Sequence, residues 1–387
     1  MRNTKNTNVI FFTIVAILLI SGFVFLVSAS TVAGMERKVP DGWYYVKHQI
    51  MMGFCVGLPG LLFFSKFDYR KLKKVSLVLF ILNILALLLT FVPFFSVAGE
   101  KAYRSLNLKF ITFQPAEFLK ITLILVLAVL FTTRSGKEHK NFWKTAFPFW
   151  TYLGVVSVIL LLQPSTSIVI VLACTSIIMY WCSNFSIVYG IIGCIALLVI
   201  VGIIFVVLYA SGLCTTVNKN TGQIQDRCLE YRWRRIQAFF NPQDESLSET
   251  YQPKQAKIGL GTGGWLGVGL GQSRQKYSYL PESFTDSIFA IIGEELGFAG
   301  SFGIILLFFF FYVSGLSIIK NAPDVFGSFL ALGLISWIVV QAFIHILSTS
   351  GFIPLTGIPL PFISYGGSLY IVTLWSLGIL SNISRHQ

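Results

Sequence analysis

Long apolar runs alternate with short polar segments along the whole chain. Most runs approach the length of about 20 residues that a helix needs to cross the hydrocarbon core of a bilayer. The pattern predicts an all-α polytopic membrane protein with about ten transmembrane helices. The expected spans lie at about 8–28, 48–65, 75–96, 114–133, 146–163, 167–182, 186–210, 287–318, 326–347 and 367–381.

Composition supports the membrane class. Of the 387 residues, 55% are hydrophobic and 12% are charged, whereas soluble domains carry about 25% charged residues. The N-terminal apolar segment resembles a signal peptide, but it is longer than a typical h-region and more spans follow, so we interpret it as the first transmembrane helix. The net charge of +13 marks cytoplasmic loops and contact with anionic lipid rather than a nucleic-acid partner.

Lysine and arginine are unevenly distributed between the predicted loops. With the N-terminus inside, the cytoplasmic side holds thirteen of them, at Arg2, Lys5, Lys66, Arg70, Lys71, Lys73, Lys74, Arg134, Lys137, Lys140, Lys144, Lys320 and Arg385. The short outer loops hold six, at Arg37, Lys38, Lys47, Lys101, Arg104 and Lys109. Both termini are therefore expected in the cytoplasm. One long extracytoplasmic segment, about 211–285, lies between the seventh and eighth helices. Its Cys214 and Cys228 are candidates for a disulfide, because they lie outside the reducing cytosol; free thiols are the alternative.

Charged residues in and beside the spans are the clearest functional signal. Glu117 and Lys120, spaced i,i+3, share a face at the start of the fourth span, as a structural ion pair or a functional one. Asp286 opens the eighth span, where it either caps the helix or accepts a proton from a hydroxyl nucleophile. We expect Asp286 and Lys120 to meet. Glu294 and Glu295 lie deeper, and we favour structural pairing with helix termini or basic side chains.

Three further segments are expected near the same outer surface. The glycine-rich run at 259–273 is interpreted as a flexible loop whose amides approach a phosphate or headgroup, or as a plain connector. YRWRRIQAFFNP, residues 231–242, offers Arg232 and Arg235 for lipid-surface anchoring or for binding a diphosphate. PLTGIPLPFISYGGS, residues 354–368, cannot form a continuous helix and is expected to wall a cavity.

The sequence lacks the signatures of several other classes of protein. The four histidines are scattered, without H-E-x-x-H or Cys/His spacing, which disfavours a structural zinc site. No Walker sequence is present, which disfavours ATP-driven transport by this chain alone.

These segments, in this order, resemble the SEDS family of bacterial cell-wall proteins over nearly the entire chain. The resemblance rests on FQPAEFLK, YRWRRIQAFFNP, GLGQSRQKYSYLPESFTDSIFAIIGEELGF and TGIPLPFISYGGS. GLGQSRQKYSYLPES is similar to the FtsW/SpoVE branch rather than to the elongation branch, RodA. The resemblance implies one transmembrane domain over residues 1–387. It also implies a glycosyltransferase that polymerises lipid II into glycan strands at the outer face of the bacterial plasma membrane, in cell division.

The resemblance also implies partners and site residues. Family members work with a class B penicillin-binding protein, which crosslinks the strands, and with other divisome membrane proteins. The family's essential aspartate falls on Asp286, and its Y-R-x-x-R pattern falls on Arg232 and Arg235. Its Q-P-S-E-x-x-K pattern falls on residues 114–120, with Ala116 in place of the serine.

Two positions depart from the family pattern. Arg104 matches the arginine of N-G-A-x-R-W, but Ser105 stands where tryptophan is usual. Ser165 replaces the aspartate of P-D-L-G-T. Both departures bear on the shape of the substrate groove and therefore on the assignment to a branch.

The family's product linkage implies inversion, so the expected reaction is one direct displacement by an acceptor sugar hydroxyl on a lipid-diphosphate donor. Asp286 would be the base, Lys120 would position it, and Glu117 would balance the buried charge. The predicted diphosphate-binding residues are Arg232, Arg235 and Lys276. The predicted cavity lining comprises Gln114, Pro281, Glu282, Thr285, Ser364, Tyr365 and Gly366. A divalent cation, magnesium or manganese, is a candidate to share the diphosphate charge, although no residue pattern shows one.

Two other functions fit part of the pattern. A lipid II flippase would use intramembrane charge and a membrane-level cavity equally well, but its alternating access is often built from inverted repeats, and we detect none. A non-enzymatic scaffold of the division or elongation machinery would instead dock a partner's transmembrane helix on a lipid-facing surface.

Overall fold

We analysed a computed structural model of the chain. It describes residues 2–387 except for residues 38, 93–104, 108–111, 135–141, 164, 184, 197–201, 203–214, 218–223, 227–228 and 242–247. The candidate disulfide of Cys214 and Cys228, and Arg104, lie outside the described residues.

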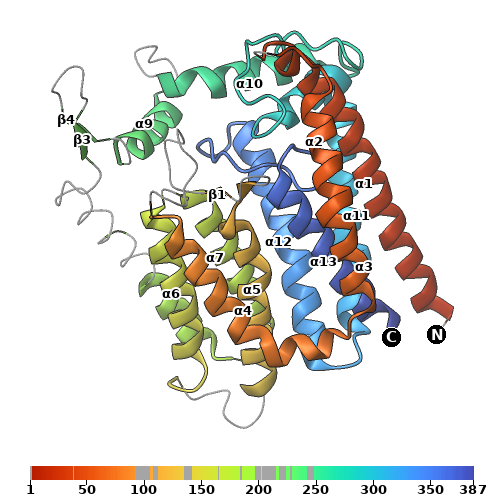
Figure 1. Cartoon of the computed structure of the whole chain (residues 1–387), viewed down its shortest axis with the longest axis vertical. Coiled ribbons are helices and arrows are strands. Elements are labelled where there is room, and N and C mark those ends of the chain that lie inside the picture. Colours follow the sequence, from red (N-terminus) through yellow and green to blue (C-terminus); the bar gives the residue numbers. More distant parts are fainter. Residues whose placement is uncertain are drawn as a thin grey trace.

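The described chain is built mainly from helices that run along one axis (Figure 1). The bounds are α1 Arg2–Met35, α2 Tyr44–Met52, η1 Gly53–Gly57, α3 Leu58–Lys66, α4 Tyr69–Leu89, α5 Pro115–Arg134, α6 Ala146–Leu162, α7 Thr166–Cys182, α9 Leu229–Phe240, η2 Ser248–Thr250, α10 Tyr251–Thr262, α11 Ile288–Lys320, α12 Val325–Thr349 and α13 Gly367–Arg385. The strands are β1 Leu106–Asn107, β2 Thr112–Phe113, β3 Thr215–Val217 and β4 Ile224–Asp226.

The apolar helices follow the predicted spans closely. Within the described residues, 7 segments are long and apolar enough to cross a membrane, the second of them formed by α2, η1 and α3 together. Three shorter apolar helices, Ala146–Leu162, Thr166–Cys182 and Ile187–Ala196, fall on the fifth, sixth and seventh predicted spans. The prediction of a nearly all-helical membrane protein is therefore confirmed. The β-structure is limited to two short antiparallel pairs, β1–β2 and β3–β4, in the part of the chain that the structure describes.

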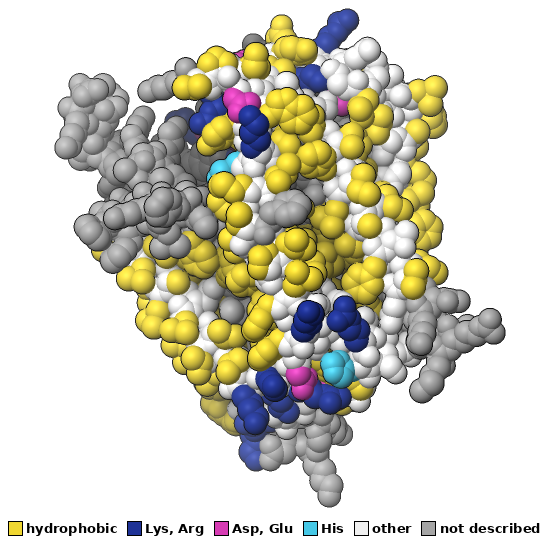
Figure 2. Space-filling model, turned by 45° about the vertical axis from the view of Figure 1, so that its right-hand side comes forward, with side chains coloured by type: hydrophobic (Ala, Val, Ile, Leu, Met, Phe, Trp, Pro, Cys, Tyr) yellow, Lys and Arg dark blue, Asp and Glu magenta, His cyan; other side chains and the backbone are white. Residues whose placement is uncertain are grey.

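The two chain ends lie together at one end of the bundle (Figure 1). The side-chain amide of Asn8 donates to the Ser384 carbonyl at 3.3 Å, and the Gln387 amide donates to the Ile318 carbonyl at 2.8 Å. The C-terminal end of α11 therefore lies with the termini, and its start at Ile288 lies at the opposite end. Figure 2 shows apolar side chains across the middle of the face in view, with several Lys and Arg side chains below them and a few above.

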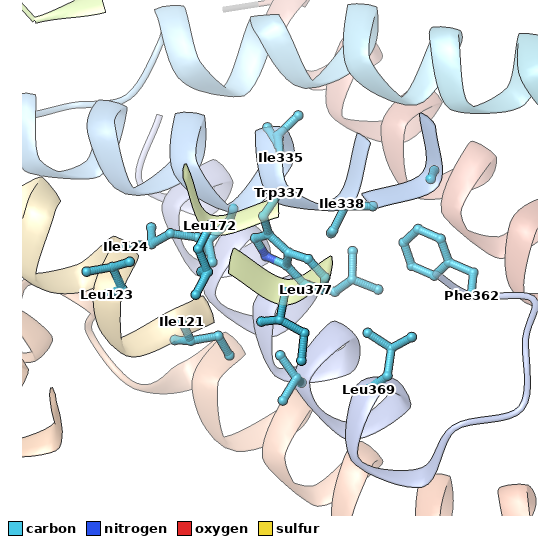
Figure 3. Packing of buried hydrophobic residues seen from close by; sticks show 14 of the residues in the cluster. Ile121, Leu123, Ile124, Leu172, Ile335, Trp337, Ile338, Phe362, Leu369 and Leu377 are labelled. Carbon is cyan, nitrogen blue, oxygen red and sulfur yellow. The ribbon is translucent and has the colours of Figure 1, made fainter. Parts of the chain in front are cut away.

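The core is centred on α12, which packs against α5, α7 and α11. Figure 3 shows Trp337 of α12 in the middle of this core, among aliphatic side chains that include Ile338 and Leu377 of α13. Trp337 and Ile338 are fully buried. A helix that is apolar on nearly every face has to be surrounded by other helices or lipid, which explains why α12 is the central helix of the bundle.

The glycine-rich run is ordered, so the expectation of a flexible loop was wrong. Its first residues extend α10 to Thr262, and the rest packs against a kink in α11 at Gly297, where φ is 65°. The kink interrupts the helical bonding of α11, and the backbone of the glycine-rich run bonds to the groups that are left without helical partners. The amides of Val268 and Gly269 donate to the carbonyls of Glu294 and Glu295, and the amides of Phe298 and Ala299 donate to the carbonyls of Gly264 and Trp265.

Glycine is required where these two segments meet. A Cβ on Gly297 would lie 2.4 Å from the Gly267 amide nitrogen, and a Cβ on Gly267 would lie 2.1 Å from the Glu295 carbonyl oxygen. Only residues without a side chain allow two backbones to approach this closely. The run therefore closes the end of α11 that lies opposite the chain termini and helps to hold the turns that precede the helix.

Candidate active site

Asp286 lies in a series of turns immediately before α11, at the end of the bundle opposite the termini. Ser287, rather than Asp286, takes the N-cap position. The residues before Asp286 are tied to the loop between α12 and α13: the Tyr365 amide donates to the Phe284 carbonyl at 2.9 Å. Asp286 itself is half-buried, so a carboxylate on a well-held backbone remains accessible.

Asp286 and Arg235 converge on the backbone of Gly357. A Cβ built on Gly357 would lie 3.2 Å from the Asp286 Oδ2 atom and 3.6 Å from the Arg235 Nη1 atom. Gly357 has φ of +66°, in the left-handed region that glycine tolerates and other residues seldom adopt. The absence of a side chain thus leaves room for a carboxylate and a guanidinium beside the same peptide.

Arg235 reaches this point from α9. Its guanidinium donates from Nη1 to the Leu355 carbonyl at 2.9 Å, and the residue is half-buried. The sequence placed Arg235 in a diphosphate site, and the structure brings it to Asp286 across some fifty residues of chain. Arg232 lies one turn earlier in α9, but its side chain is outside the described part of the structure.

Glu117 and Lys120 form the predicted ion pair inside the bundle. The Lys120 ammonium donates to Glu117 Oε2 at 2.8 Å and to the Gln341 side-chain oxygen at 2.6 Å. It also lies 5.0 Å from the centre of the Trp337 ring, at the distance of a cation–π contact. Lys120 is 0% exposed.

Direct contact between Lys120 and Asp286 was also expected, and among the described contacts there is none. The Lys120 ammonium instead bonds to Glu117 and Gln341. The Gln341 side chain also bonds to the loop, because its Nε2 atom donates to the Pro359 carbonyl at 2.8 Å. Pro359 belongs to the loop that carries Gly357, so Lys120 is connected to the Asp286 region through α12 and the loop.

Glu294 and Glu295 are structural, as the sequence favoured. Glu294 accepts hydrogen bonds from the Ser273 hydroxyl and from the amides of Arg274 and Gln275. Glu295 Oε1 pairs with the Lys276 ammonium at 3.1 Å. Both glutamates are at most 1% exposed. Their carboxylates therefore hold the turns at 273–276 against α11, below the segment that presents Asp286.

Lys276 was predicted to bind the diphosphate, but its environment favours a structural role. Besides Glu295, the ammonium donates to the Gly271 carbonyl at 2.5 Å and to the Ser28 hydroxyl at 3.3 Å. Lys276 is 7% exposed and borders a cavity of about 480 Å³ between α1 and the 270–277 turns. The Lys276 ammonium therefore already donates to three acceptors within the protein.

Lys276→Met should therefore lower stability rather than substrate affinity. The change leaves the Glu295 carboxylate with hydrogen bonds from Ser28 and Ser273 but without its counter-ion. Breaking a buried ion pair from one side costs about 3–5 kcal/mol. Thermal unfolding in detergent should show the loss, with an unchanged KM for lipid II. A raised KM in a variant as stable as the parent would restore the diphosphate role.

The residues predicted to line a cavity differ in how exposed they are. Pro281 and Glu282 are exposed, and Thr285 and Gly366 are half-buried beside Asp286 and α13. Ser364 is buried, where its hydroxyl donates to the Thr285 carbonyl and accepts from the Leu360 amide, each at 2.7 Å. Ser364 thus joins two segments of the site instead of lining an open surface.

Two more of the predicted lining residues make contacts of their own. The backbone amide of Gln114 donates to the Ser368 hydroxyl at 3.2 Å, which links the start of α5 to α13. The Tyr365 hydroxyl lies 2.9 Å from the His48 Nδ1 atom. Burial raises the pKa of Tyr365 to about 12, so this phenol stays protonated near neutral pH and can donate or accept one hydrogen bond.

Sequence reasoning missed Gly357 and the polar residues of α12. Gly357 is one glycine in an irregular proline-rich loop, and nothing in its neighbours signals a positive φ. Gln341 and His345 carried a clearer signal, because polar side chains inside an apolar span are costly unless they are bonded or functional. Their spacing of four residues places them on one helix face.

Gly357→Ala should sharply reduce turnover without unfolding the protein. The new methyl group would press on the Asp286 carboxylate at 3.2 Å and on the Arg235 guanidinium. A displacement of about 1 Å can cost about 10²-fold in rate. Turnover of lipid II by purified protein measures the effect. Gly264→Ala is the matched control, since Gly264 also has a positive φ, +54°, but no atom within 4 Å of an added Cβ. Equal losses in the two variants would mean that backbone strain alone is responsible.

The donor set for a metal ion is limited. Among the described residues, no group of three or more His, Cys, Asp or Glu side chains could hold a metal ion. A divalent cation held by the substrate's own diphosphate stays a prediction, and no step proposed below depends on it.

The fold and site define a polytopic membrane protein with a carboxylate and a guanidinium at one end of a helical bundle. A family model described as "Cell cycle protein", the FtsW/RodA/SpoVE model, matches residues 8–387. The chain belongs to this family, which confirms the resemblance to the SEDS proteins.

Named relatives cover the whole chain. "Probable peptidoglycan glycosyltransferase FtsW" of Geobacter sp. (strain M18) is 33% identical over 100% of this chain and 99% of its own length. "Stage V sporulation protein E" of Bacillus subtilis (strain 168) is also 33% identical, over 100% of both chains.

Solved structures share the fold. A chain of a peptidoglycan synthase complex that coordinates polymerization and crosslinking superposes with a TM-score of 0.72 at 22% identity, over 97% of both chains. The rod shape determining protein RodA of Thermus thermophilus gives a TM-score of 0.66 at 20% identity, over 97% of this chain and 95% of that one.

Proposed function

We propose that this protein is a peptidoglycan glycosyltransferase that polymerises lipid II at the outer face of the bacterial plasma membrane. The observation that carries the proposal is the convergence of Asp286 and Arg235 on Gly357. One group can accept a proton and the other can stabilise a negative charge, and a glycosyl transfer from a diphosphate donor needs both. The relatives named as peptidoglycan glycosyltransferases support the same activity.

The mechanism is one direct displacement. The acceptor sugar hydroxyl attacks the anomeric carbon of the donor, a new C–O bond forms, and the bond to the diphosphate oxygen breaks. Asp286 accepts the hydroxyl proton. The electron pair of the broken bond leaves with the diphosphate, and Arg235, with Arg232 on the same helix, stabilises that charge by forked hydrogen bonds.

The buried pair of Glu117 and Lys120 supports the site from a distance. The Lys120 ammonium holds Gln341, and Gln341 holds the Pro359 carbonyl of the loop beside Asp286. The pair therefore acts through the protein interior rather than by contact with the base. With both termini in the cytoplasm, Asp286 lies at the outer side, where the lipid-linked donor and the growing strand are presented.

We also propose cell division as the setting and a class B penicillin-binding protein as the partner. The likeness of the 269–283 segment to the FtsW/SpoVE branch supports the first. The synthase complex that shares the fold, in which polymerization and crosslinking are coordinated, supports the second.

Incubation of purified protein with labelled lipid II, with and without a class B penicillin-binding protein, tests the proposal. Glycan strands resolved by gel electrophoresis are the expected product. Leaflet exchange of lipid II in vesicles without glycan would show a flippase, and neither activity in a complex that still assembles would show a scaffold.

A further inference from the structure

Three polar side chains on α12 face the loop that carries Gly357. Gln341, His345 and Ser348 are separated by four and three residues, so they share one side of the helix. They are 0%, 1% and 4% exposed. Polar groups at this depth in an apolar helix are costly unless they are bonded, and the partner of each is a backbone group of the loop or, for Gln341, Lys120 as well.

Gln341 and His345 hold two consecutive carbonyls. The Gln341 Nε2 atom donates to the Pro359 carbonyl at 2.8 Å, and the His345 Nδ1 atom lies 2.7 Å from the Ile358 carbonyl oxygen. Because a carbonyl oxygen only accepts, the imidazole carries its proton on Nδ1. These bonds fix the loop on the C-terminal side of Gly357.

Ser348 and Arg235 hold the other side. The Thr356 amide donates to the Ser348 hydroxyl oxygen at 2.8 Å, and the Arg235 guanidinium donates to the Leu355 carbonyl at 2.9 Å. The backbone is thus bonded both before and after Gly357. The Gly357 backbone, beside the Asp286 carboxylate, lies between these bonded positions.

We propose that this row of α12 is a positioning device for the glycosyl transfer, and the inference rests on the function proposed above. Gln341, His345 and Ser348 hold the Gly357 backbone in place, and this backbone sets how close the Asp286 carboxylate and the Arg235 guanidinium come to each other. The row bonds to the loop and not to the reacting groups. Its members are positioning residues and not catalytic ones.

His345 offers the sharpest test. Asparagine at position 345 can place an amide N–H near the place of Nδ1, whereas leucine has similar bulk and no donor. His345→Leu should lower kcat by about 10²-fold, the loss expected for misplacement of about 1 Å, with little change in KM. His345→Asn should recover most of that loss. Rates are measured against lipid II concentration, with the penicillin-binding protein present.

Hydrogen exchange by mass spectrometry supplies a readout that does not depend on activity. Peptides covering residues 354–366 should exchange faster in His345→Leu than in the parent and in His345→Asn. Ser348→Ala, a smaller change that removes only the acceptor of the Thr356 amide, should act in the same direction if the leucine variant fails to fold. Ser336→Ala is the control, because that buried hydroxyl on α12 has no partner among the described residues.

Three results would overturn the proposal. In the first, His345→Leu exchanges faster in the loop but keeps the parent kcat, so that the row is only structural. In the second, a folded His345→Asn is as inactive as His345→Leu, which would assign the imidazole another role. In the third, only KM changes. If the parent itself makes no glycan while loop exchange responds as expected, the function proposed above fails, and the positioning role in glycosyl transfer fails with it.

Discussion

Asp286→Asn should nearly abolish the polymerisation of lipid II and leave the fold intact. The amide keeps the size of the carboxylate but cannot accept the proton of the acceptor hydroxyl. A well-placed general base typically contributes about 10²–10⁴-fold in rate, and a loss in this range is expected. Because Asp286 is half-buried at a surface turn, the variant should have the same unfolding temperature as the parent. Gel analysis of glycan strands from purified protein measures the loss.

Asp41→Asn is the matched control for this change. Asp41 is also an aspartate in a turn, and it pairs with Lys47 at 2.9 Å in a solvent-exposed ion pair. Such pairs contribute at most about 1 kcal/mol, so this variant should polymerise lipid II like the parent. Polymerisation by Asp286→Asn at the parent rate would remove Asp286 as the base.

Glu117→Leu should strongly destabilise the protein, and a second change should reverse the effect. The single variant leaves the Lys120 ammonium buried, at 0% exposure, with Gln341 as its remaining hydrogen-bond partner. Breaking a buried ion pair from one side costs about 3–5 kcal/mol, whereas replacing both partners with apolar residues is often neutral or stabilising. The double variant Glu117→Leu/Lys120→Met should therefore regain most of the lost stability.

Unfolding in detergent, followed for the parent and both variants, measures these differences. The pair has a second role in the proposed mechanism, because Lys120 also holds Gln341. The double variant should be stable and still turn over lipid II more slowly than the parent. If Glu117→Leu is as stable as the parent, the ion pair does not stabilise the fold. If the double variant is fully active, the pair contributes to stability but not to turnover.

Glu117 and Lys120 show which contacts can be predicted from the spacing of residues along one helix. Their spacing on one helix face predicted the ion pair, because residues three apart on a helix are neighbours whatever surrounds the helix. The same reasoning predicted that Glu294 and Glu295 would be paired, since two adjacent buried carboxylates both need partners. It failed for the link between Lys120 and Asp286, because the Lys120 ammonium donates to Gln341 of another helix instead.

The glycine-rich run at 259–273 shows where reasoning from local composition fails. Its composition is typical of a flexible loop, but the run is bonded to a kink in α11 at Gly297. Composition reports what a segment can do in isolation. It does not report that another segment, some thirty residues further on, presents unpaired backbone groups that only a glycine backbone can approach.

The sequence by itself determined the membrane class and the course of the helices, because a bilayer accepts only long apolar segments whose backbone groups are bonded internally. It also identified Asp286 and Arg235 as separate candidates. Only the tertiary structure decided that they meet at Gly357 and that α12 holds the loop in place there. Those contacts depend on the paths of irregular turns between helices, which are set by packing and by hydrogen bonds between distant segments and leave no periodic pattern in the chain.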